Sequence, residues 1–483
     1  MNILFLNPPF IGRFSRTSRS PAVTKGGTLY YPIWLAYATG VAEEDGHHVV
    51  LIDAPACGVG MQEVEEKLNS FSPALIVIDT STPSIYSDIN VAVSLKKKFP
   101  NSFIVLVGTH PSALPEQTLR IKTEVDAVAI GEYDYTIKDL AHALEDKKGL
   151  DTVDGLAFRS NNSICINKQR EKIKSLDDVP FVSSVYKRHL NPRHYFFAAA
   201  NYPMVMIITG RGCPYICHFC VYPQVFHSRQ YRVRSPENVA AEFEFIRSNF
   251  PGVKEIGIED DCFTANKDHV RNICSLLIKN KNRIKWYCNA RGDIEYELLK
   301  HMKEAGCRLV TVGFESGVQT VLDTIDKRIT VEKYYQFARD AKKADILVHG
   351  CLMVGNPHDT KETLAQSYAF AKKINCDSMQ FYPLYVYPGT EAYHWARNNN
   401  YLKTDDFSKW LTEEGLHNCV LDIPGLSSTD MVQLCDDYLK KYHLRPEYIA
   451  MKLMQAIRNP SEGYRSLKSA KVFFSKLFSG KIR

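Results

Sequence analysis

Residues 204–220 read MVMIITGRGCPYICHFC, and they carry the clearest structural signal in the chain. The stretch begins as a run of apolar and β-branched residues with the length of a buried strand, and it ends in a loop rich in cysteine. Three residues and then two residues separate Cys213, Cys217 and Cys220. This spacing lets one short loop offer three thiolates to a compact metal centre and leaves a fourth position open. We therefore predict a strand that leads directly into a metal-binding loop.

Five further strands, separated by helical stretches, follow along the chain. The six run over Met204–Thr209, Lys254–Glu259, Ile284–Asn289, Arg308–Phe314, Ile346–Met353 and Ser378–Leu384. Parallel strands with helices between them predict a partial (β/α)6 barrel over residues 196–395. The chemistry of such barrels takes place at the carboxyl ends of the strands, where the cysteine loop is expected.

Residues 1–148 show the same alternation of strands and helices. The expected strands are Ile3–Leu6, Val49–Asp53, Leu75–Asp79, Phe103–Val107 and Ala127–Ile130, with helices near 32–45, 61–70, 84–99 and 135–147. This α/β order predicts a doubly wound parallel sheet, whose ligand crevice lies beyond the carboxyl ends of the strands. Small, polar or turn-forming residues follow those ends: Asn7, Pro8, Thr80, Ser81, Gly108, His110, Gly131 and Glu132.

Two segments depart from this alternation. Residues 149–195 predict a hairpin and a charged linker. Residues 396–483 predict a helical C-terminal region that ends in a basic tail, with six basic and no acidic residues from Arg465 to Arg483. Leu467, Ala470, Phe474 and Leu477 or Phe478 recur there at helical spacing. Either this apolar stripe docks on the barrel, or the tail lies on a membrane surface.

The composition limits the classes of function. A length of 483 residues predicts two or three domains. The composition, with 45% hydrophobic and 24% charged residues, excludes a disordered chain. The net charge of +6 is too small to indicate a nucleic-acid partner. The start MNILFLNPPF lacks the pattern of a signal peptide, and the longest apolar stretch, Tyr195 to Gly210, is too short to span a bilayer. We expect a cytoplasmic, monomeric protein.

CxxxCxxC with an aromatic residue before the last cysteine, after the first strand of a β/α barrel, resembles the radical S-adenosylmethionine (SAM) superfamily. The resemblance implies a 4Fe-4S cluster on Cys213, Cys217 and Cys220, with Phe219 beside the cofactors. It also implies that SAM chelates the open iron and is split by an electron from the cluster to give a 5′-deoxyadenosyl radical. A structural zinc site that includes His218, or three buried thiols, are the alternatives.

The same resemblance implies that polar residues and turns at the ends of later strands hold SAM. These are Asp260 and Asp261 for the methionyl amine, Arg291 for the methionyl carboxylate, Glu315 and Ser316 for the ribose or the amino acid, and Gly355 and Pro357 beside the adenine. Each has a structural alternative: Arg291 as a surface ion pair, Glu315 as a helix N-terminal acid, and the two aspartates as helix caps.

A doubly wound domain ahead of such a barrel resembles the cobalamin-binding radical SAM enzymes. LNPP near the start, GTHPSALPE after the fourth strand and GEYD after the fifth carry this likeness. The D-x-H-x-x-G motif that supplies a histidine to cobalt is absent, because Asp45-Gly46-His47 is followed by Val50 where the motif has glycine. The resemblance therefore implies cobalamin bound without a protein histidine on cobalt, with His110 as a possible crevice contact.

VPFVSSVYKRHL before the barrel and YRVRSPENV after the cysteines resemble the branch of hopanoid-associated radical enzymes and the anaerobic magnesium-protoporphyrin ester cyclase. This branch implies a lipid, isoprenoid or tetrapyrrole substrate, and an electron donor such as flavodoxin or ferredoxin. We expect methyl transfer, ring formation or rearrangement at an unactivated carbon. A tRNA methylthiotransferase would need further cysteines in the first domain, where only Cys57 occurs. A non-catalytic cobalamin or cluster sensor is the remaining alternative.

Overall fold

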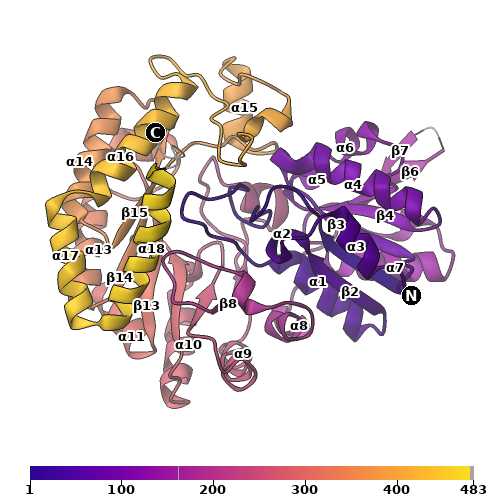
Figure 1. Cartoon of the computed structure of the whole chain (residues 1–483), viewed down its shortest axis with the longest axis horizontal. Coiled ribbons are helices and arrows are strands. Elements are labelled where there is room, and N and C mark those ends of the chain that lie inside the picture. Colours follow the sequence, from indigo (N-terminus) through magenta and orange to yellow (C-terminus); the bar gives the residue numbers. More distant parts are fainter. Residues whose placement is uncertain (162, 479–483) are drawn as a thin grey trace.

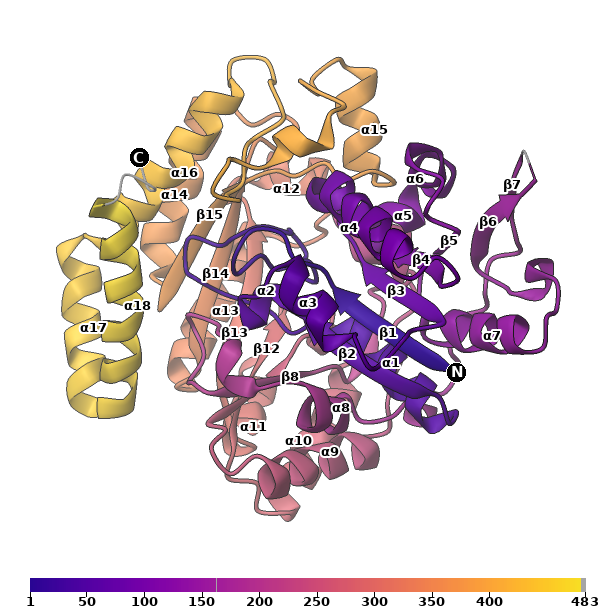
Figure 2. The same cartoon turned by 45° about the vertical axis from the view of Figure 1, so that its right-hand side comes forward.

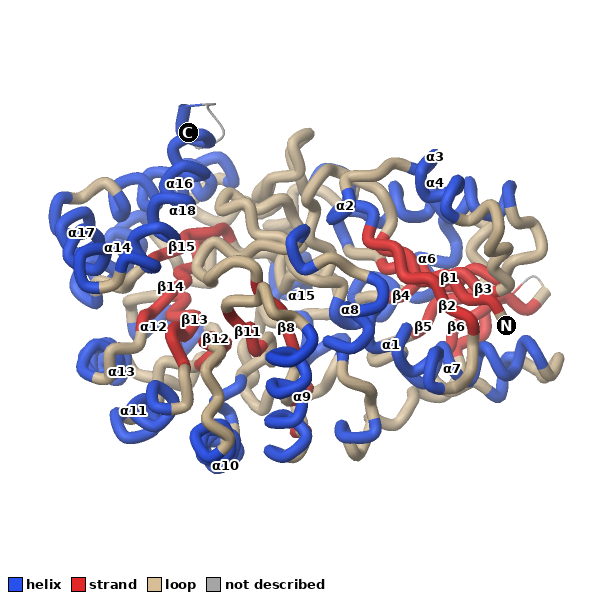
Figure 3. Tube along the Cα trace, turned by 60° about the horizontal axis from the view of Figure 1, so that its bottom comes forward, coloured by secondary structure: helices blue, strands red, loops and turns tan. Residues whose placement is uncertain are grey.

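Two α/β units lie side by side in the computed structural model (Figure 1). The structure describes residues 1–161 and 163–478, with the backbone alone at 473 and 475–478. Figure 3 shows the strands of the two units separated by a band of loops. No helix among the described residues is both long enough and apolar enough to cross a membrane.

The first unit contains a seven-stranded sheet in the order β2-β1-β3-β4-β5-β6-β7, and β1 to β5 are parallel as predicted. Helices on both faces bury the sheet, so every residue of β3 is buried. The strands are β1 (Asn2–Asn7), β2 (His48–Asp53), β3 (Leu75–Asp79), β4 (Phe103–Val107), β5 (Ala127–Ala129), β6 (Leu156–Ser160) and β7 (Ser163–Ile166). The helices are α1 (Ile33–Glu44), α2 (Ala54–Cys57), α3 (Met61–Lys67), α4 (Ile85–Lys98), α5 (Thr109–Ala113), α6 (Pro115–Ile121), α7 (Asp134–Glu145) and α8 (Val182–His189).

The hairpin expected in the linker belongs to the sheet instead. Strand β6 pairs antiparallel with β5, with Ala127 opposite Phe158, and β7 pairs with β6. The prediction that this hairpin stands apart from the first domain is therefore wrong. The physical reason is that β5 is short and wholly buried, so its edge must be covered by another strand.

The second unit is a six-stranded, all-parallel sheet in the order β15-β14-β13-β12-β11-β8, which confirms the partial barrel. Its strands are β8 (Met204–Ile207), β11 (Glu255–Ile258), β12 (Lys285–Ala290), β13 (Cys307–Glu315), β14 (Leu347–Val354) and β15 (Ser378–Pro383). Its helices are α9 (Pro236–Asn249), α10 (Lys267–Lys279), α11 (Tyr296–Glu304), α12 (Gln319–Thr324), α13 (Val331–Lys343) and α14 (Lys361–Ile374).

The C-terminal region is helical, as expected. It contains α15 (Glu391–Asn398), α16 (Ser428–His443), α17 (Pro446–Arg458) and α18 (Pro460–Phe478). Helix α16 packs on β15, and α17 and α18 form a hairpin at the edge of the molecule (Figures 1 and 2).

The segment from residue 9 to residue 31 leaves the first sheet and crosses to the barrel (Figure 2). Tyr31 donates a hydrogen bond to the carbonyl of Met204 on β8, at one edge of the open barrel. Lys25 forms an ion pair with Asp436 of α16, on the side of β15. The segment therefore bridges the gap that a six-stranded barrel leaves between its first and last strands.

Candidate active site between the two sheets

A short antiparallel ribbon, which the sequence analysis missed, encloses the cysteine loop. Strands β9 (Gly210–Arg211) and β10 (Arg232–Val233) pair on either side of it. Gly212 has φ +90°, and a Cβ there would clash with the carbonyl oxygen of Gln230. Only glycine fits, because the backbone conformation and the close approach both exclude a side chain. The ribbon thus fixes the loop at the end of β8.

The three thiols of this loop form no disulfide, and all are at least partly buried. Among the described residues, one group of three His, Cys, Asp or Glu side chains brings its ligand atoms within 4.8 Å of one another. That group is Asp45, His47 and His142, and it does not include the cysteine loop. At least two of the sulfurs of Cys213, Cys217 and Cys220 are therefore farther apart. A single zinc ion would hold its thiolates about 3.8 Å apart, given tetrahedral bonds of about 2.3 Å. In a cubane each thiolate binds a different iron, so the three sulfurs need not all lie within 4.8 Å of one another.

Gln224 holds the backbone of the cysteine loop. Its Nε2 donates to the carbonyls of His218 (3.0 Å) and Cys220 (2.9 Å), and its Oε1 accepts from the backbone N–H of Glu391 (3.0 Å). Gln224 lies in η5 (Tyr222–Phe226), a π-helix directly after the loop. No feature of the sequence singled out this glutamine.

Protein groups already bind both aspartates after β11. The Asp260 carboxylate accepts from the backbone and hydroxyl of Thr209 (both 2.6 Å) and from the Tyr231 hydroxyl (2.8 Å). Burial raises the pKa of Asp260 to about 6, while these hydrogen bonds oppose that shift. Burial would also raise the pKa of Asp261, but His227 at 2.8 Å lowers it below its usual value. The methionyl-amine role of both carboxylates stays a prediction.

Arg291 is buried, which rules out the alternative of a surface ion pair. Its guanidinium donates to the carbonyl of Arg328 (2.7 Å) and to Asp293 (3.1 Å), and it lies 4.0 Å from the centre of the Tyr215 ring. Tyr215 belongs to the cysteine loop, so Arg291 lies beside that loop. Its predicted pairing with a methionyl carboxylate is untested.

Glu315 and Phe219 meet at Lys327, a residue that the sequence analysis missed. Lys327 Nζ lies 2.9 Å from Glu315 Oε1 and 6.0 Å from the centre of the Phe219 ring. The Tyr382 hydroxyl donates to Glu315 Oε2 (3.1 Å). Glu315 is the last residue of β13, so the alternative of a helix N-terminal acid is wrong. Ser316 is buried, and its hydroxyl lies 3.1 Å from that of Ser367 on α14.

The turn after β14 is held by Asp359. Its Oδ2 accepts from the backbone N–H groups of Gly355 (3.0 Å) and Asn356 (2.9 Å). Pro357 is buried in the same turn. The side-chain oxygen of Asn356 is buried without a hydrogen-bond partner, which leaves one acceptor available at this turn.

At the first sheet, several candidate crevice residues surround a fully buried ion pair between Arg16 and Asp88 (2.5 Å). Arg16 donates to the Asn7 side chain (2.8 Å) and to the Pro8 carbonyl (2.7 Å). The Thr80 hydroxyl donates to Asp88 (2.6 Å). Ser81 joins this group, with its hydroxyl 2.8 Å from that of Ser84, which also donates to Asp88. These polar groups bind one another, and their predicted contact with a ligand stays a prediction.

Some polar atoms at this edge have no hydrogen-bond partner within the described part of the chain. His110 is buried against Phe407, its Nδ1 lies 3.2 Å from the Thr82 hydroxyl, and its Nε2 has no partner. Burial lowers the pKa of His110 to about 3, so the ring is neutral. The buried Tyr133 hydroxyl also lacks a partner. Burial raises the pKa of Asp79 to about 7 despite the opposing charge of Arg16.

Backbone approach and ion pairs explain three more of the candidates. A Cβ on Gly108 would clash with the carbonyl of Thr80, which allows only glycine there. The backbone N–H of Gly131 donates a hydrogen bond to the Ser112 hydroxyl (2.9 Å). Glu132 is buried and forms an ion pair with Arg232 of β10. Glu132 therefore connects the two units.

Arginine side chains join the cysteine loop and the end of β11 to the first domain. Arg211, two residues before Cys213, donates to both carboxylate oxygens of Asp134 (2.7 and 3.0 Å), and its guanidinium lies 4.9 Å from the centre of the Tyr37 ring. From the crossing segment, Arg19 donates to the Asp260 carbonyl (2.7 Å). Moreover, η5 contacts α5. The carboxyl edges of the two sheets therefore face each other across the cysteine loop.

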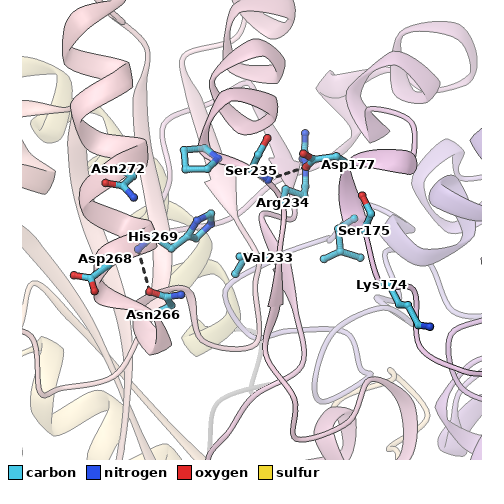
Figure 4. A pocket seen from close by; sticks show the side chains of 12 residues that line it. Lys174, Ser175, Asp177, Val233, Arg234, Ser235, Asn266, Asp268, His269 and Asn272 are labelled. Atoms are coloured by element: carbon cyan, nitrogen blue, oxygen red, sulfur yellow. Dashed lines mark hydrogen bonds between the residues drawn. The ribbon is translucent and has the colours of Figure 1, made fainter.

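A surface pocket of about 600 Å³ lies outside this region, beside the N-termini of α9 and α10 (Figure 4). Asp177 there accepts from the backbone N–H of Ser235 (2.7 Å), and Asn266 caps α10 through the N–H of His269 (3.0 Å). None of the predicted site residues lines this pocket.

Comparison with known proteins decides between the alternatives. Residues 207–371 match the radical SAM superfamily, and residues 19–141 match the B12 binding domain. An uncharacterized methyltransferase of Pyrococcus horikoshii is 30% identical over 457 residues, which cover 94% of this chain and 95% of that protein. The chain belongs to the B12-binding radical SAM enzymes.

Two further proteins are similar to this radical SAM enzyme. The anaerobic magnesium-protoporphyrin IX monomethyl ester cyclase of Cereibacter sphaeroides is 28% identical, over 78% of this chain and 62% of the cyclase. The fold is shared with the radical SAM methyltransferase TsrM of Kitasatospora setae, at a TM-score of 0.70 and 15% identity over 92% of this chain and 89% of that one. The expected likeness to the cyclase is confirmed, whereas the hopanoid-associated part stays a prediction.

The cofactors of the enzyme are a 4Fe-4S cluster, SAM and cobalamin. The cysteine loop suits the cluster, because it offers three free thiols, which are the usual ligands of such clusters. Burial raises the pKa of Cys220 to about 12, so assembly must displace its proton. The edge of the first sheet suits cobalamin, because His110 Nε2 and the Tyr133 hydroxyl are buried there without partners.

Proposed function

We propose that this B12-binding radical SAM enzyme methylates an unactivated carbon of a lipid, isoprenoid or tetrapyrrole-like small molecule. The proposal rests on the observation that the carboxyl edges of the two sheets face each other. Arg211 and Arg232 bind the acidic residues after β5, and η5 contacts α5, so the cysteine loop lies against the cobalamin edge. A substrate carbon between the edges would be within reach of both cofactors.

One face of β15 carries uncharged side chains that such a substrate could contact. Phe381 of β15 contacts Tyr368 of α14 and Tyr438 of α16, so the alternate residues of β15 face the other way, into the lumen. Those residues are uncharged and partly or fully exposed: Ser378, Gln380 and Tyr382. His349 on β14 lies beside them, 2.7 Å from the Ser378 hydroxyl, and burial lowers its pKa to about 4. Neutral polar groups favour a largely apolar substrate with few polar substituents.

When bound, the cluster with SAM supplies a radical that removes hydrogen from carbon, and cobalamin supplies a methyl carrier. The residues of the chain hold and shield these groups. Cys213, Cys217 and Cys220 would bind three irons, and Gln224 fixes the carbonyls of their loop. Arg19 of the crossing segment donates to the Asp260 carbonyl at the end of β11, and burial raises the pKa of Tyr30 in the same segment.

The test is an anaerobic assay of reconstituted holoenzyme with a reductant. We expect 5′-deoxyadenosine and S-adenosylhomocysteine to form together once substrate is present. Mass spectrometry identifies that substrate by comparing the lipid and pigment fractions of a deletion strain with those of the same strain after complementation. Absence of 5′-deoxyadenosine from a protein that holds cluster and SAM would favour the sensor alternative.

Ring formation or rearrangement is the second candidate, because one relative is a cyclase. The two reactions separate in the same assay. A cyclase would form 5′-deoxyadenosine without S-adenosylhomocysteine, and its product would carry no additional methyl group.

A further inference from the structure

Exposed apolar side chains gather on the α17–α18 hairpin. Of the eleven large hydrophobic side chains exposed among the described residues, six lie on α17 and on residues 460–467 of α18. They are Ile449, Leu453, Met454, Ile457, Tyr464 and Leu467, and we term them the hairpin surface. No residue of α17 is buried, although Ile449, Leu453 and Ile457 repeat at helical spacing. A soluble protein seldom leaves such a stripe exposed without a partner.

Polar side chains of α18 contact the protein, and Val472 of the same helix lies beside Gly27. Ser469 and Arg465 donate to the carbonyl of Ala198 (2.8 and 3.2 Å), and Lys468 Nζ lies 3.8 Å from the centre of the Tyr202 ring. Leu467 is 72% exposed. The alternative in which the apolar stripe docks on the barrel is therefore wrong for Leu467, while the side chains of Leu477 and Phe478 lie outside the described residues.

The positive charge of the chain is concentrated in the same part of the sequence. Residues 440–483 contain eleven lysines and arginines against two glutamates, a net charge of +9. The whole chain carries +6, so residues 1–439 carry −3. Lys441, Arg458 and Lys471 are exposed and have no ion pair within the described part of the chain.

We propose that the hairpin surface docks on an anionic lipid bilayer. Apolar side chains would enter the region between head groups and acyl chains, and the surrounding cations would face the lipid phosphates. The charge argues against a second copy of this chain, because dimerisation through this surface would bring two strongly positive regions together. This proposal is independent of the proposed reaction.

The test is flotation of the full-length holoenzyme with vesicles of phosphatidylcholine alone or mixed equally with phosphatidylglycerol. We expect binding to the mixed vesicles only. It should weaken steeply between about 0.1 M and about 1 M salt, as the Debye length falls from ~10 to ~3 Å. Each cation near the surface is worth about fivefold in affinity, from about 1 kcal/mol. Arg458→Glu with Lys471→Glu should therefore weaken binding at least tenfold.

Leu453→Glu with Ile457→Glu should weaken binding at least tenfold, since these side chains are 61% and 82% exposed. Ile166→Glu with Ile278→Glu is the matched apolar control, because both residues are exposed and lie far from the hairpin in sequence. Arg283→Glu with Lys300→Glu is the matched charge control. Neither control should change binding, and thermal unfolding should show all variants folded.

Three results would overturn the proposal. The first is failure of the wild-type protein to bind mixed vesicles at low salt. The second is equal loss of binding in the control variants. The third is a concentration-dependent dimer that Leu453→Glu with Ile457→Glu converts to a monomer without any lipid binding, which would make the surface a self-interface.

Discussion

The polar residues at the carboxyl edges of the two sheets differ in which of them are already bound by other protein groups. At the first sheet, Asn7, Thr80 and Ser81 belong to a network around the buried pair Arg16 and Asp88, and the free polar atoms lie on His110 and Tyr133. At the barrel, the three thiols have no covalent partner, whereas Asp260 and Ser316 are bound by protein groups. Each edge therefore mixes residues that hold the fold with residues left available for a cofactor.

This difference shows which kind of residue reveals its role in a sequence. Three cysteines at this spacing have few structural uses, so their chemistry could be predicted directly. Threonine, serine and aspartate after a strand satisfy backbone and hydroxyl groups as often as they bind a ligand. The comparison can be tested edge by edge.

The largest effect is expected at the cysteine loop. Replacing Cys213, Cys217 and Cys220 together with alanine should abolish iron and sulfide binding and all cleavage of SAM, because no other three cysteines in the sequence have this spacing. Iron analysis and release of 5′-deoxyadenosine measure the loss. Cys288→Ala is the matched control, since Cys288 is buried in β12 and should leave the cluster intact. Normal iron content in the triple variant would contradict the assignment of the loop.

The order of strands and helices in both units could be predicted from the sequence, because apolar periodicity and buried strands mark it directly. The parts that could not be predicted depend on contacts between distant residues. Gln224 carries no local signal, and its role appears only when η5 folds back on the loop. Arg16 and Asp88 are 72 residues apart. Strands β6 and β7 extend the first sheet because the edge of β5 must be covered by another strand. The apolar periodicity of the sequence does not show this.

The second effect concerns the network of the first sheet. Arg16→Met or Asp88→Leu should each lower the free energy of unfolding by about 3–5 kcal/mol, because either change leaves a buried charge unpaired. The double variant should cost less than the sum, since it removes both charges. Thermal or urea unfolding of the cobalamin-free protein measures these values. Strictly additive costs would show that the pair is not coupled.

A third effect, of up to similar size, separates the two edges by pH. The pKa of Asp79 is about 7 in the folded protein against 3.8 as the ordinary value, so the folded state keeps a proton that the unfolded state loses. The free energy of unfolding should therefore fall as pH rises from about 4 to about 7, by up to about 4 kcal/mol. Asp79→Asn should remove this slope in the cobalamin-free protein.

Asp261 at the barrel should show the opposite sign. Its pKa is lowered on folding, so its contribution to stability is present above the ordinary pKa and is lost as pH falls through the folded one. Asp261→Asn should therefore destabilise the protein at pH 7 and have little effect in acid. Equal pH profiles for the Asp79 and Asp261 variants would contradict the difference between the edges.

The smallest effect is expected from the histidines of the first domain. His47 lies just before β2, whereas the cobalamin edge follows the last residue of that six-residue strand, roughly 20 Å away at ~3.3 Å per residue. His110 is at the right edge but is neutral, buried and in contact with Thr82 and Phe407. Electron paramagnetic resonance of the cobalt(II) form should therefore show no nitrogen splitting from a protein ligand, and His47→Ala and His110→Ala should leave the spectrum unchanged. An imidazole triplet that disappears in either variant would place a histidine on cobalt and would make the missing D-x-H-x-x-G motif irrelevant to this enzyme.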